Sequence, residues 1–369
     1  MDYPNKELWY RKTNAYFWTD FETAAEHQLS CGTGNERDGR GFDIDRYINS
    51  EVGSSTMENL YPFLQWHDDP GCPEAIAYWA GLGMKKEIHD ADDPDRVWSI
   101  FTPIEETAAP GRTYPVVFCF HGKNNPIPLS ETYGYVRLGG KEKFIVICPW
   151  GKNCDGQHDK GDFSMADEVM RIWAFVRENY PVDLSRVYTA GFSGGGRAAQ
   201  VLAFRNPTMF AAIAPSPQFF VVDAKEAEWA ALEKVGCPVV CASGAYDRYL
   251  PVRKESWNDN IRHWLHVNGI NNAAAEAMNL ESNLLRTSYA DPAVAKSGIP
   301  FPTARIERHD GCDWYVGEFQ NGDGVPVVRM AVVSEMPHWP TGYWAEFHWS
   351  FLKHWHRDPA SGKTLYTKE

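Results

Sequence analysis

A single serine, Ser193, stands among glycines in the segment RVYTAGFSGGGRAAQ, residues 186–200. Residues 191–195 read G-x-S-x-G, a pattern typical of a nucleophilic serine held on a sharp turn between a strand and a helix. A β-branched run precedes the pattern and an Ala-rich run follows it, so both flanking elements are predicted. We therefore expect Ser193 to be a catalytic nucleophile; the alternative is a glycine-rich connection with an ordinary serine.

A serine hydroxyl becomes a strong nucleophile only when a base takes its proton and a carboxylate orients that base. With this motif the acid and then the histidine should follow the serine along the chain, each in a loop after a strand. Asp247 is the candidate acid, because it follows the apolar run PVVCASG directly. The competing carboxylates lie in a less regular part of the sequence and include Asp291, Asp310 and Asp313.

His338 is the candidate base among the histidines that follow Asp247. It lies in the short loop MPHWPTG, between the strand-like run PVVRMAVVSE and the last predicted helix. Prolines on either side restrict this loop and would help to fix the imidazole. A metal cluster is the weaker alternative for three further histidines on or just past the last helix, because no matching Cys/His set accompanies His348, His354 and His356. No metal and no cofactor is expected.

Acyl transfer also requires N–H donors for the tetrahedral oxyanion. The backbone N–H of Gly194, directly after the nucleophile, is the first candidate. The second should come from the loop after an early strand, here CFHGKNN at 119–125, where the choice between Gly122 and Lys123 stays open. His121 in the same loop is interpreted as shaping the loop rather than as the base.

Two tryptophans are candidate substrate contacts. Trp150 and Trp339 each follow a predicted strand at the edge where the catalytic residues are expected, and residues 151–166 border the same edge. Ligand pockets are lined mainly by apolar and aromatic side chains. Core packing is the equal alternative for both residues.

Apolar runs that alternate with amphipathic helices predict an α/β fold with a mostly parallel central sheet and helices on both faces. Ligands of such sheets bind beyond the carboxyl ends of the strands, where all the residues above are expected to lie. The predicted strands span 96–103, 114–122, 143–151, 186–190, 210–217 and 237–247. The predicted helices span 167–181, the stretch from the glycines to Arg205, 253–267, and the last helix with a buried stripe of Trp344, Phe347, Phe351 and Trp355.

The chain divides into two parts by pattern. Residues 1–95 lack a clear period and are expected to form an N-terminal extension packed on the main domain, with a separate small domain as the alternative. Residues 96–369 are expected to form the catalytic domain, interrupted by an insertion near 270–330. Within 312–336 the sequence predicts a hairpin that turns at residues 321–324.

Composition narrows the class of protein. Of 369 residues, 43% are hydrophobic and 23% charged, as in soluble globular enzymes. The first residues lack the pattern of a signal peptide and no run is long and apolar enough to span a bilayer, so a cytoplasmic location and no membrane partner are expected. The formal net charge of −13 argues against a nucleic-acid partner, so none is expected, and the oligomeric state stays open, a homo-oligomer included.

The cysteines indicate packing rather than chemistry. The eight cysteines form no C-x-x-C pair and no regular framework. Cys119, Cys148 and Cys241 lie in apolar strand-like runs, where a reduced cysteine packs as a small hydrophobe.

Several motifs together resemble the polyhydroxybutyrate depolymerase-like and feruloyl-esterase-like branch of the α/β-hydrolases, over roughly residues 95–355. These motifs are YPVVFCFHG, DEVMRIWAFVRENYPVDLSRVYTAGFSGGG, NPTMFAAIAPSP, CPVVCASGAYD and PHWP. The resemblance implies a metal-free serine esterase with Ser193, Asp247 and His338 as nucleophile, acid and base. The expected substrates are soluble carboxylic esters, such as hydroxycinnamoyl, acetyl-glycoside or hydroxyalkanoate oligomer esters. A peptidase or acyltransferase with the same triad, or a non-catalytic ligand-binding scaffold, remain the alternatives.

Overall fold

The structure is a computed structural model of the whole chain. It describes residues 71–105, 110–122, 129–151, 164–216, 226–244, 263–270, 303–309, 311–333 and 342–368. Ser193, Gly194, Gly122 and Trp150 lie within these ranges, whereas Lys123, Asp247, His338 and Trp339 lie outside them.

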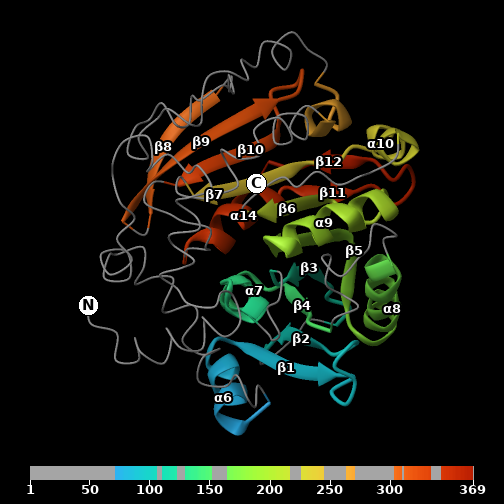
Figure 1. Cartoon of the computed structure of the whole chain (residues 1–369), viewed down its shortest axis with the longest axis vertical. Coiled ribbons are helices and arrows are strands. Elements are labelled where there is room, and N and C mark those ends of the chain that lie inside the picture. Colours follow the sequence, from blue (N-terminus) through green and yellow to red (C-terminus); the bar gives the residue numbers. More distant parts are fainter. Residues whose placement is uncertain are drawn as a thin grey trace, which may run out of the picture.

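A ten-stranded sheet runs from β1 at one end of the molecule to β8 at the other, in the order β1-β2-β4-β3-β5-β6-β7-β10-β9-β8 (Figure 1). The strands are β1 (Met84–His89), β2 (Trp98–Pro103), β3 (Tyr114–Phe120), β4 (Ile145–Pro149), β5 (Val182–Phe192), β6 (Ala212–Ser216), β7 (Val239–Gly244), β8 (Thr303–His309), β9 (Cys312–Gln320) and β10 (Pro326–Val333). Strands β4, β3, β5, β6, β7 and β10 run parallel, and antiparallel strands extend both edges. The predicted mostly parallel α/β sheet is confirmed.

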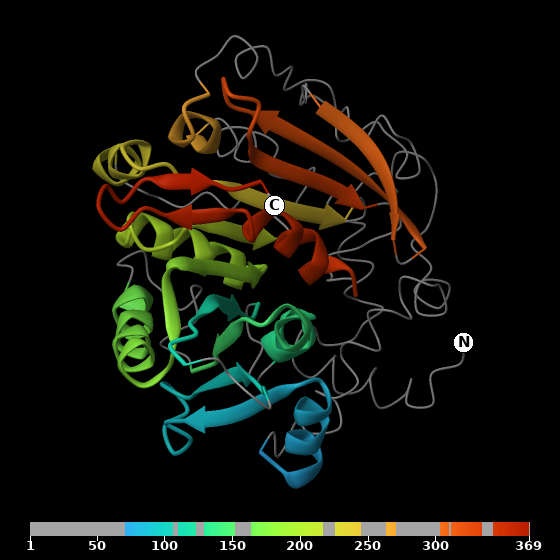
Figure 2. The same ribbon diagram turned by 180° about the vertical axis from the view of Figure 1, so that it is seen from behind.

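The described helices include α6 (Pro73–Gly81), α7 (Tyr135–Glu142), α8 (Ser164–Asn179), α9 (Gly194–Arg205), α10 (Glu226–Glu233) and α14 (Trp344–Leu352), with a 3₁₀ turn η1 (Leu129–Thr132) before α7. Helices α7 and α14 lie side by side, and so do α8 and α9, in both views (Figures 1 and 2). A two-stranded sheet of β11 (Trp355–Arg357) and β12 (Thr364–Tyr366) follows α14.

Side-chain alternation places these helix pairs on opposite faces of the sheet. Phe118 of β3 makes an edge-to-face contact with Trp173 of α8. Its neighbour Val117 pairs in register with Tyr188 of β5, whose ring contacts Trp349 of α14. Because successive side chains of a strand point to opposite faces, α8 and α14 cover different sides. Helices therefore lie on both faces, as predicted.

The apolar stripes read from the sequence form the core. Val169, Ile172, Trp173 and Val176 of α8 are buried, as are Trp344, Phe347, Phe351 and Trp355 of the last helix and the strand after it. Each large side chain buried in this way contributes roughly 1.5–3 kcal/mol to folding. Cys119, Cys148 and Cys241 are fully buried among the apolar side chains of the strands, which confirms their packing role.

The sheet is longer than the sequence pattern indicated. Strand β1 pairs antiparallel with β2, so the sheet begins before the domain boundary expected at residue 95. At the other end, β8 and β9 continue the sheet beyond β10, so the expected insertion contains sheet strands. The predicted hairpin is confirmed: β9 and β10 are antiparallel, and Asn321 N–H donates to Val325 O at the turn. None of the helices in the described ranges is both long and apolar enough to cross a bilayer.

Candidate functional site

Ser193 has a backbone conformation that a residue with a side chain adopts only under strain. It follows β5 directly and is the residue before the first turn of α9, with φ 55° and ψ −114°. Its N–H donates to Ser216 O at the end of β6, 2.8 Å away. Such conformations cost on the order of 1–3 kcal/mol and persist where the surroundings enforce them, which is often at functional sites.

The glycines around Ser193 are required by close backbone approach. A Cβ on Gly191 would lie 2.3 Å from the carbonyl carbon of Gly195, and a Cβ on Gly195 would lie 2.3 Å from Phe120 O. Both distances are far below van der Waals contact. Helix α9 thus starts directly against the ends of β5 and β3, and only glycine fits at either position.

Helix α9 supplies the electrostatics of this turn. Gly194 is its first residue, so no earlier turn of the helix can accept the Gly194 N–H. The N-terminus of a helix also carries a partial positive charge that favours a nearby anion. Ser193 as a whole residue is 9% exposed, so both effects operate with limited access of water. The arrangement suits a reaction in which negative charge develops on an oxygen atom beside the serine.

The end of β3 lies next to the turn that contains Ser193. His121 is buried, and its Nδ1 donates to Gly122 O at 2.7 Å, which holds the loop in a tight bend. The carbonyl oxygens of Phe120 and His121 lie closest to Gly195 of α9. The structure therefore brings His121 and Gly122 next to the turn of Ser193, and the His121 contact supports its interpretation as a loop-shaping residue. The choice of Gly122 or Lys123 as oxyanion donor stays a prediction.

The elements that should present the acid and the base end at the same edge of the sheet. Strand β7 ends at Gly244, before Asp247, and β10 ends at Val333, before His338. Both run parallel to β5 through β6, so their carboxyl ends lie on the side of Ser193. The convergence of the three side chains stays a prediction.

Trp150 lies two strands away from β5, at the end of β4. Its indole N–H donates to the hydroxyl of Ser99 at 3.2 Å, and Lys86 Nζ lies 5.8 Å from the centre of its ring. Lys86 itself forms a buried ion pair with Glu131 at 2.6 Å. Trp150 therefore packs against a buried polar cluster, and its role as a substrate contact stays a prediction.

Three buried polar side chains form a series of contacts that ends at Ser216, next to Ser193. Nothing in the sequence pattern predicted this series. Ser216 Oγ contacts His348 Nε2 of α14 at 2.9 Å, and His348 Nδ1 contacts the Tyr135 hydroxyl of α7 at 2.6 Å. His348 and Ser216 are buried, and desolvation lowers the pKa of His348 to about 3. Burial also raises the pKa of Tyr135 well above its ordinary value. All three groups are thus neutral at physiological pH.

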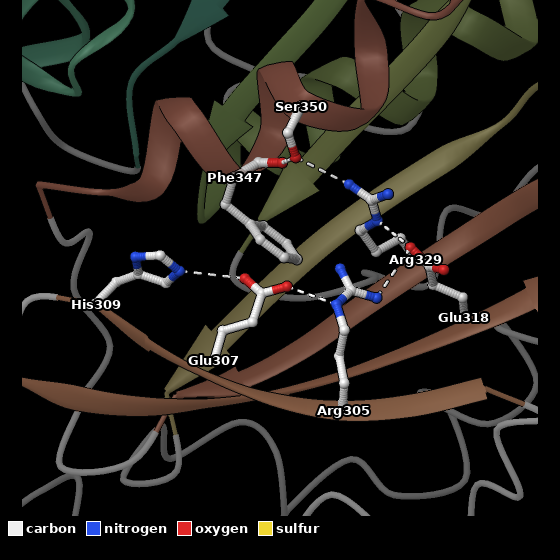
Figure 3. Close-up of polar contacts among 7 residues, drawn as sticks. All are labelled: Arg305, Glu307, His309, Glu318, Arg329, Phe347 and Ser350. Carbon is white, nitrogen blue, oxygen red and sulfur yellow. Dashed lines mark hydrogen bonds and ion pairs between the residues drawn. The ribbon is translucent and has the colours of Figure 1, made fainter. Parts of the chain in front are cut away.

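A second polar network anchors α14 to the strands beyond β10 (Figure 3). Arg329 of β10 pairs with the buried Glu318 of β9 at 2.5 Å and donates to the Ser350 hydroxyl of α14 at 2.9 Å. On β8, Glu307 accepts from Arg305 at 2.6 Å and contacts His309 at 3.2 Å. His309 lies in a regular strand, and its ring stacks on Tyr343 at the start of α14 with centroids 3.5 Å apart.

Comparison with known proteins places this chain near esterases. Residues 99–281 match the sequence model of a family described as a putative esterase. The chain is also 32% identical over 111 residues to the poly(3-hydroxyalkanoate) depolymerase C of Paucimonas lemoignei. That match covers 27% of this chain and 27% of the depolymerase, so it spans about a quarter of the relative's length.

Solved structures of similar shape are esterases and related hydrolases. The S-formylglutathione hydrolase FrmB from Staphylococcus aureus is 15% identical, with 51% of this chain and 86% of that chain covered and a TM-score of 0.37. A mutant feruloyl esterase module from Clostridium thermocellum, complexed with sinapinate, is 15% identical, with 52% and 74% covered and a TM-score of 0.39. These likenesses are too distant to support a functional argument.

Proposed function

We propose that the protein is a serine esterase with Ser193 as its nucleophile, a proposal supported by the match of residues 99–281 to the sequence model of a putative esterase family. The observation that carries the proposal is the strained backbone of Ser193 at the junction of β5 and α9, enforced by glycines that cannot hold a Cβ. This is the geometry in which a nucleophile elbow exposes its hydroxyl at the edge of the sheet.

The proposed reaction has two halves. His338 takes the proton of Ser193, whose oxygen attacks the ester carbonyl, while the backbone N–H groups of Gly194 and of Gly122 or Lys123 stabilise the oxyanion. His338 then protonates the leaving alcohol, which leaves an acyl-enzyme. Water, activated by His338, then attacks the acyl-enzyme in the same way and releases the carboxylic acid and the free Ser193. Asp247 orients the imidazole and stabilises its charged form.

The proposed substrates are soluble carboxylic esters, among them hydroxycinnamoyl esters, acetylated glycosides and hydroxyalkanoate oligomers. The likeness to a poly(3-hydroxyalkanoate) depolymerase supports the last of these. A cytoplasmic location is part of the proposal, and it favours soluble over polymeric substrates.

Replacement of the nucleophile tests the proposal directly. We expect Ser193→Ala to fold normally and to lose hydrolysis of p-nitrophenyl esters by a factor on the order of 10⁴ or more, together with labelling by a fluorophosphonate probe. Ser185→Ala is the matched control, because Ser185 lies in the same strand and bonds only locally to Asp183. Ester hydrolysis that survives in Ser193→Ala would refute the assignment.

The alternatives predict different results in the same assays. A peptidase would also cleave aminoacyl amides, which an esterase leaves nearly untouched, and an acyltransferase would pass the acyl group to an added alcohol rather than to water. A non-catalytic scaffold would leave the fluorophosphonate probe unreacted in the wild-type protein. A panel of esters that varies the acyl and alcohol parts, with Ser193→Ala as blank, would then define the substrate class.

A further inference from the structure

Ser216, at the end of the neighbouring strand β6, holds the turn that contains Ser193. The Ser216 carbonyl accepts the N–H of Ser193 at 2.8 Å, and Phe192 pairs in register with Ser216 across β5 and β6. A Cβ on Gly196, in the first turn of α9, would lie 3.1 Å from both the N and the O of Ser216. The position of Ser216 therefore determines where the backbone of Ser193 lies.

The side chain of Ser216 is itself held at two points. Its hydroxyl oxygen accepts the N–H of Ala242 of β7 at 3.0 Å and contacts His348 Nε2 at 2.9 Å. Ser216 is fully buried, so both contacts are protected from exchange with water. Loss of either partner would leave a buried polar group unpaired, which costs about 1–3 kcal/mol and favours a shift of the chain.

His348 matches this task by its chemistry and its surroundings. It is 1% exposed and lies against the ring of Trp344, with centroids 5.1 Å apart. A neutral imidazole has one donor nitrogen and one acceptor nitrogen, and its two partners here are hydroxyls that can each act in either role. Tyr135 at 2.6 Å occupies Nδ1, so the ring has one partner on each nitrogen and its orientation is fixed.

We propose that His348 is a positioning residue for the nucleophile: anchored by Tyr135, it holds Ser216, and Ser216 holds the backbone of Ser193 in its strained conformation. The inference rests on the proposed esterase function. His348 does not touch the substrate in this account. It determines where the nucleophile lies, so its loss should slow the attack of Ser193 and leave substrate affinity nearly unchanged.

The test compares variants by the rate of fluorophosphonate labelling and by kcat and KM for p-nitrophenyl acetate, each expressed per labelled active site. His348→Phe keeps a ring and removes both hydrogen bonds.

We expect His348→Phe to lower kcat and the labelling rate roughly 10- to 100-fold, with little change in KM, since small displacements of a reacting group have effects of this size. His348→Gln, which places an amide near the position of Nε2, should recover part of the loss. His354→Phe is the control, because His354 lies just past the same helix and bonds to Thr367 O at the surface.

A double-mutant cycle tests whether His348 acts through Ser216. If it does, the combination of His348→Phe with Ser216→Ala slows labelling little more than the worse single change. Additive effects, or a folded His348→Phe with the labelling rate and kcat of the wild type, would overturn the inference, even if its melting temperature falls. Should His348→Phe not fold, Tyr135→Phe replaces it in the cycle, with a smaller but again non-additive loss expected. Wild-type protein that neither labels nor hydrolyses esters would instead refute the proposed function, and the inference with it.

Discussion

At the scale of single residues, the conformation of Ser193 depends on neighbouring glycines whose surroundings leave no room for a side chain. Ser193 is one of three described non-glycine residues with positive φ, with Asp90 and Lys143. Lys143 ends α7, where a left-handed residue is a common helix terminus. Ser193 instead begins a helix, and the close approach of Gly191 and Gly195 enforces its conformation.

Gly195→Ala measures how strictly this geometry is required. The new methyl group would meet Phe120 O at 2.3 Å and His121 O at 2.6 Å, both backbone atoms that cannot rotate away. We expect a loss of about 1–3 kcal/mol in the free energy of unfolding, with a further loss of fluorophosphonate labelling in the folded fraction. Urea denaturation and labelling measure the two effects. Gly322→Ala is the control, because nothing lies within 4 Å of a Cβ there. Equal stability of the two variants would contradict this account.

The sequence could predict Ser193 because the motif is local, but it could not predict the residues that hold it. The glycines, the serine and the flanking strand and helix all lie within a few positions, so a short stretch of sequence contains the whole signal for a nucleophile. His348 contacts Ser216 across 132 positions and Tyr135 across 213, so only the fold brings them together. In the sequence His348 belongs to the buried stripe of the last helix, and nothing distinguishes it there from a packed histidine.

At the scale of elements, the strongly periodic segments were predictable and the glycine-broken ones were not. Helix α8 and the strands with unbroken apolar runs lie close to their predicted ranges. Helix α7 was missed because Gly139 and Gly140 interrupt its sequence. Close packing requires these glycines: a Cβ on Gly140 would lie 1.9 Å from Leu82 O, just before β1. Strand β1 was missed for a related reason, since its sequence MKKEIH is largely polar and Lys86 is buried only through its ion pair with Glu131.

The attachment of α14 to the sheet extension gives a prediction at this scale. Arg329 and Glu318 have side chains only 12% and 9% exposed, so Arg329→Met would leave the Glu318 carboxylate buried with Arg305 at 3.4 Å as its remaining partner. We expect a cost of about 3–5 kcal/mol, read from urea denaturation. Arg308→Met removes an exposed pair with Asp313 and should cost less than about 1 kcal/mol. A loss in Arg329→Met no larger than that in Arg308→Met would show that the Figure 3 network does not stabilise this junction.

At the scale of the whole molecule, the chain from Tyr135 to Ser216 ties one helix layer to the centre of the sheet. Helix α7 follows β3 and η1, and α14 follows the final sheet strand. Helix α14 carries the imidazole of His348, which contacts Tyr135 of α7 on one side and Ser216 of β6 on the other. In the sequence, His338 lies between the end of β10 and the start of α14, the helix that carries His348. Burial of one neutral histidine at this junction makes the stability of the entire fold depend on pH.

The sign of that dependence follows from the pKa of His348, which desolvation lowers from 6.5 to about 3. Above pH 6.5 the imidazole is neutral in the folded and unfolded states, and its contribution to stability is complete. Below pH 6.5 the unfolded chain binds a proton that the folded protein does not, so the free energy of unfolding falls by up to about 1.4 kcal/mol per pH unit until the pH nears 3.

His348→Gln removes this term, since glutamine does not titrate. We expect the free energy of unfolding of the variant to fall less steeply between pH 6.5 and pH 4.5 than that of the wild type. The two slopes should differ by up to about 1.4 kcal/mol per pH unit, the value for one proton. Urea denaturation of both proteins at several pH values measures the difference, in which the other titrating groups cancel because the two chains share them. His354→Gln serves as the matched control, because His354 lies just past the same helix and bonds to Thr367 O near the surface. Parallel curves for wild type and His348→Gln would mean that the buried imidazole accepts a proton in the folded protein, and that its contacts with Tyr135 and Ser216 tolerate a positive charge.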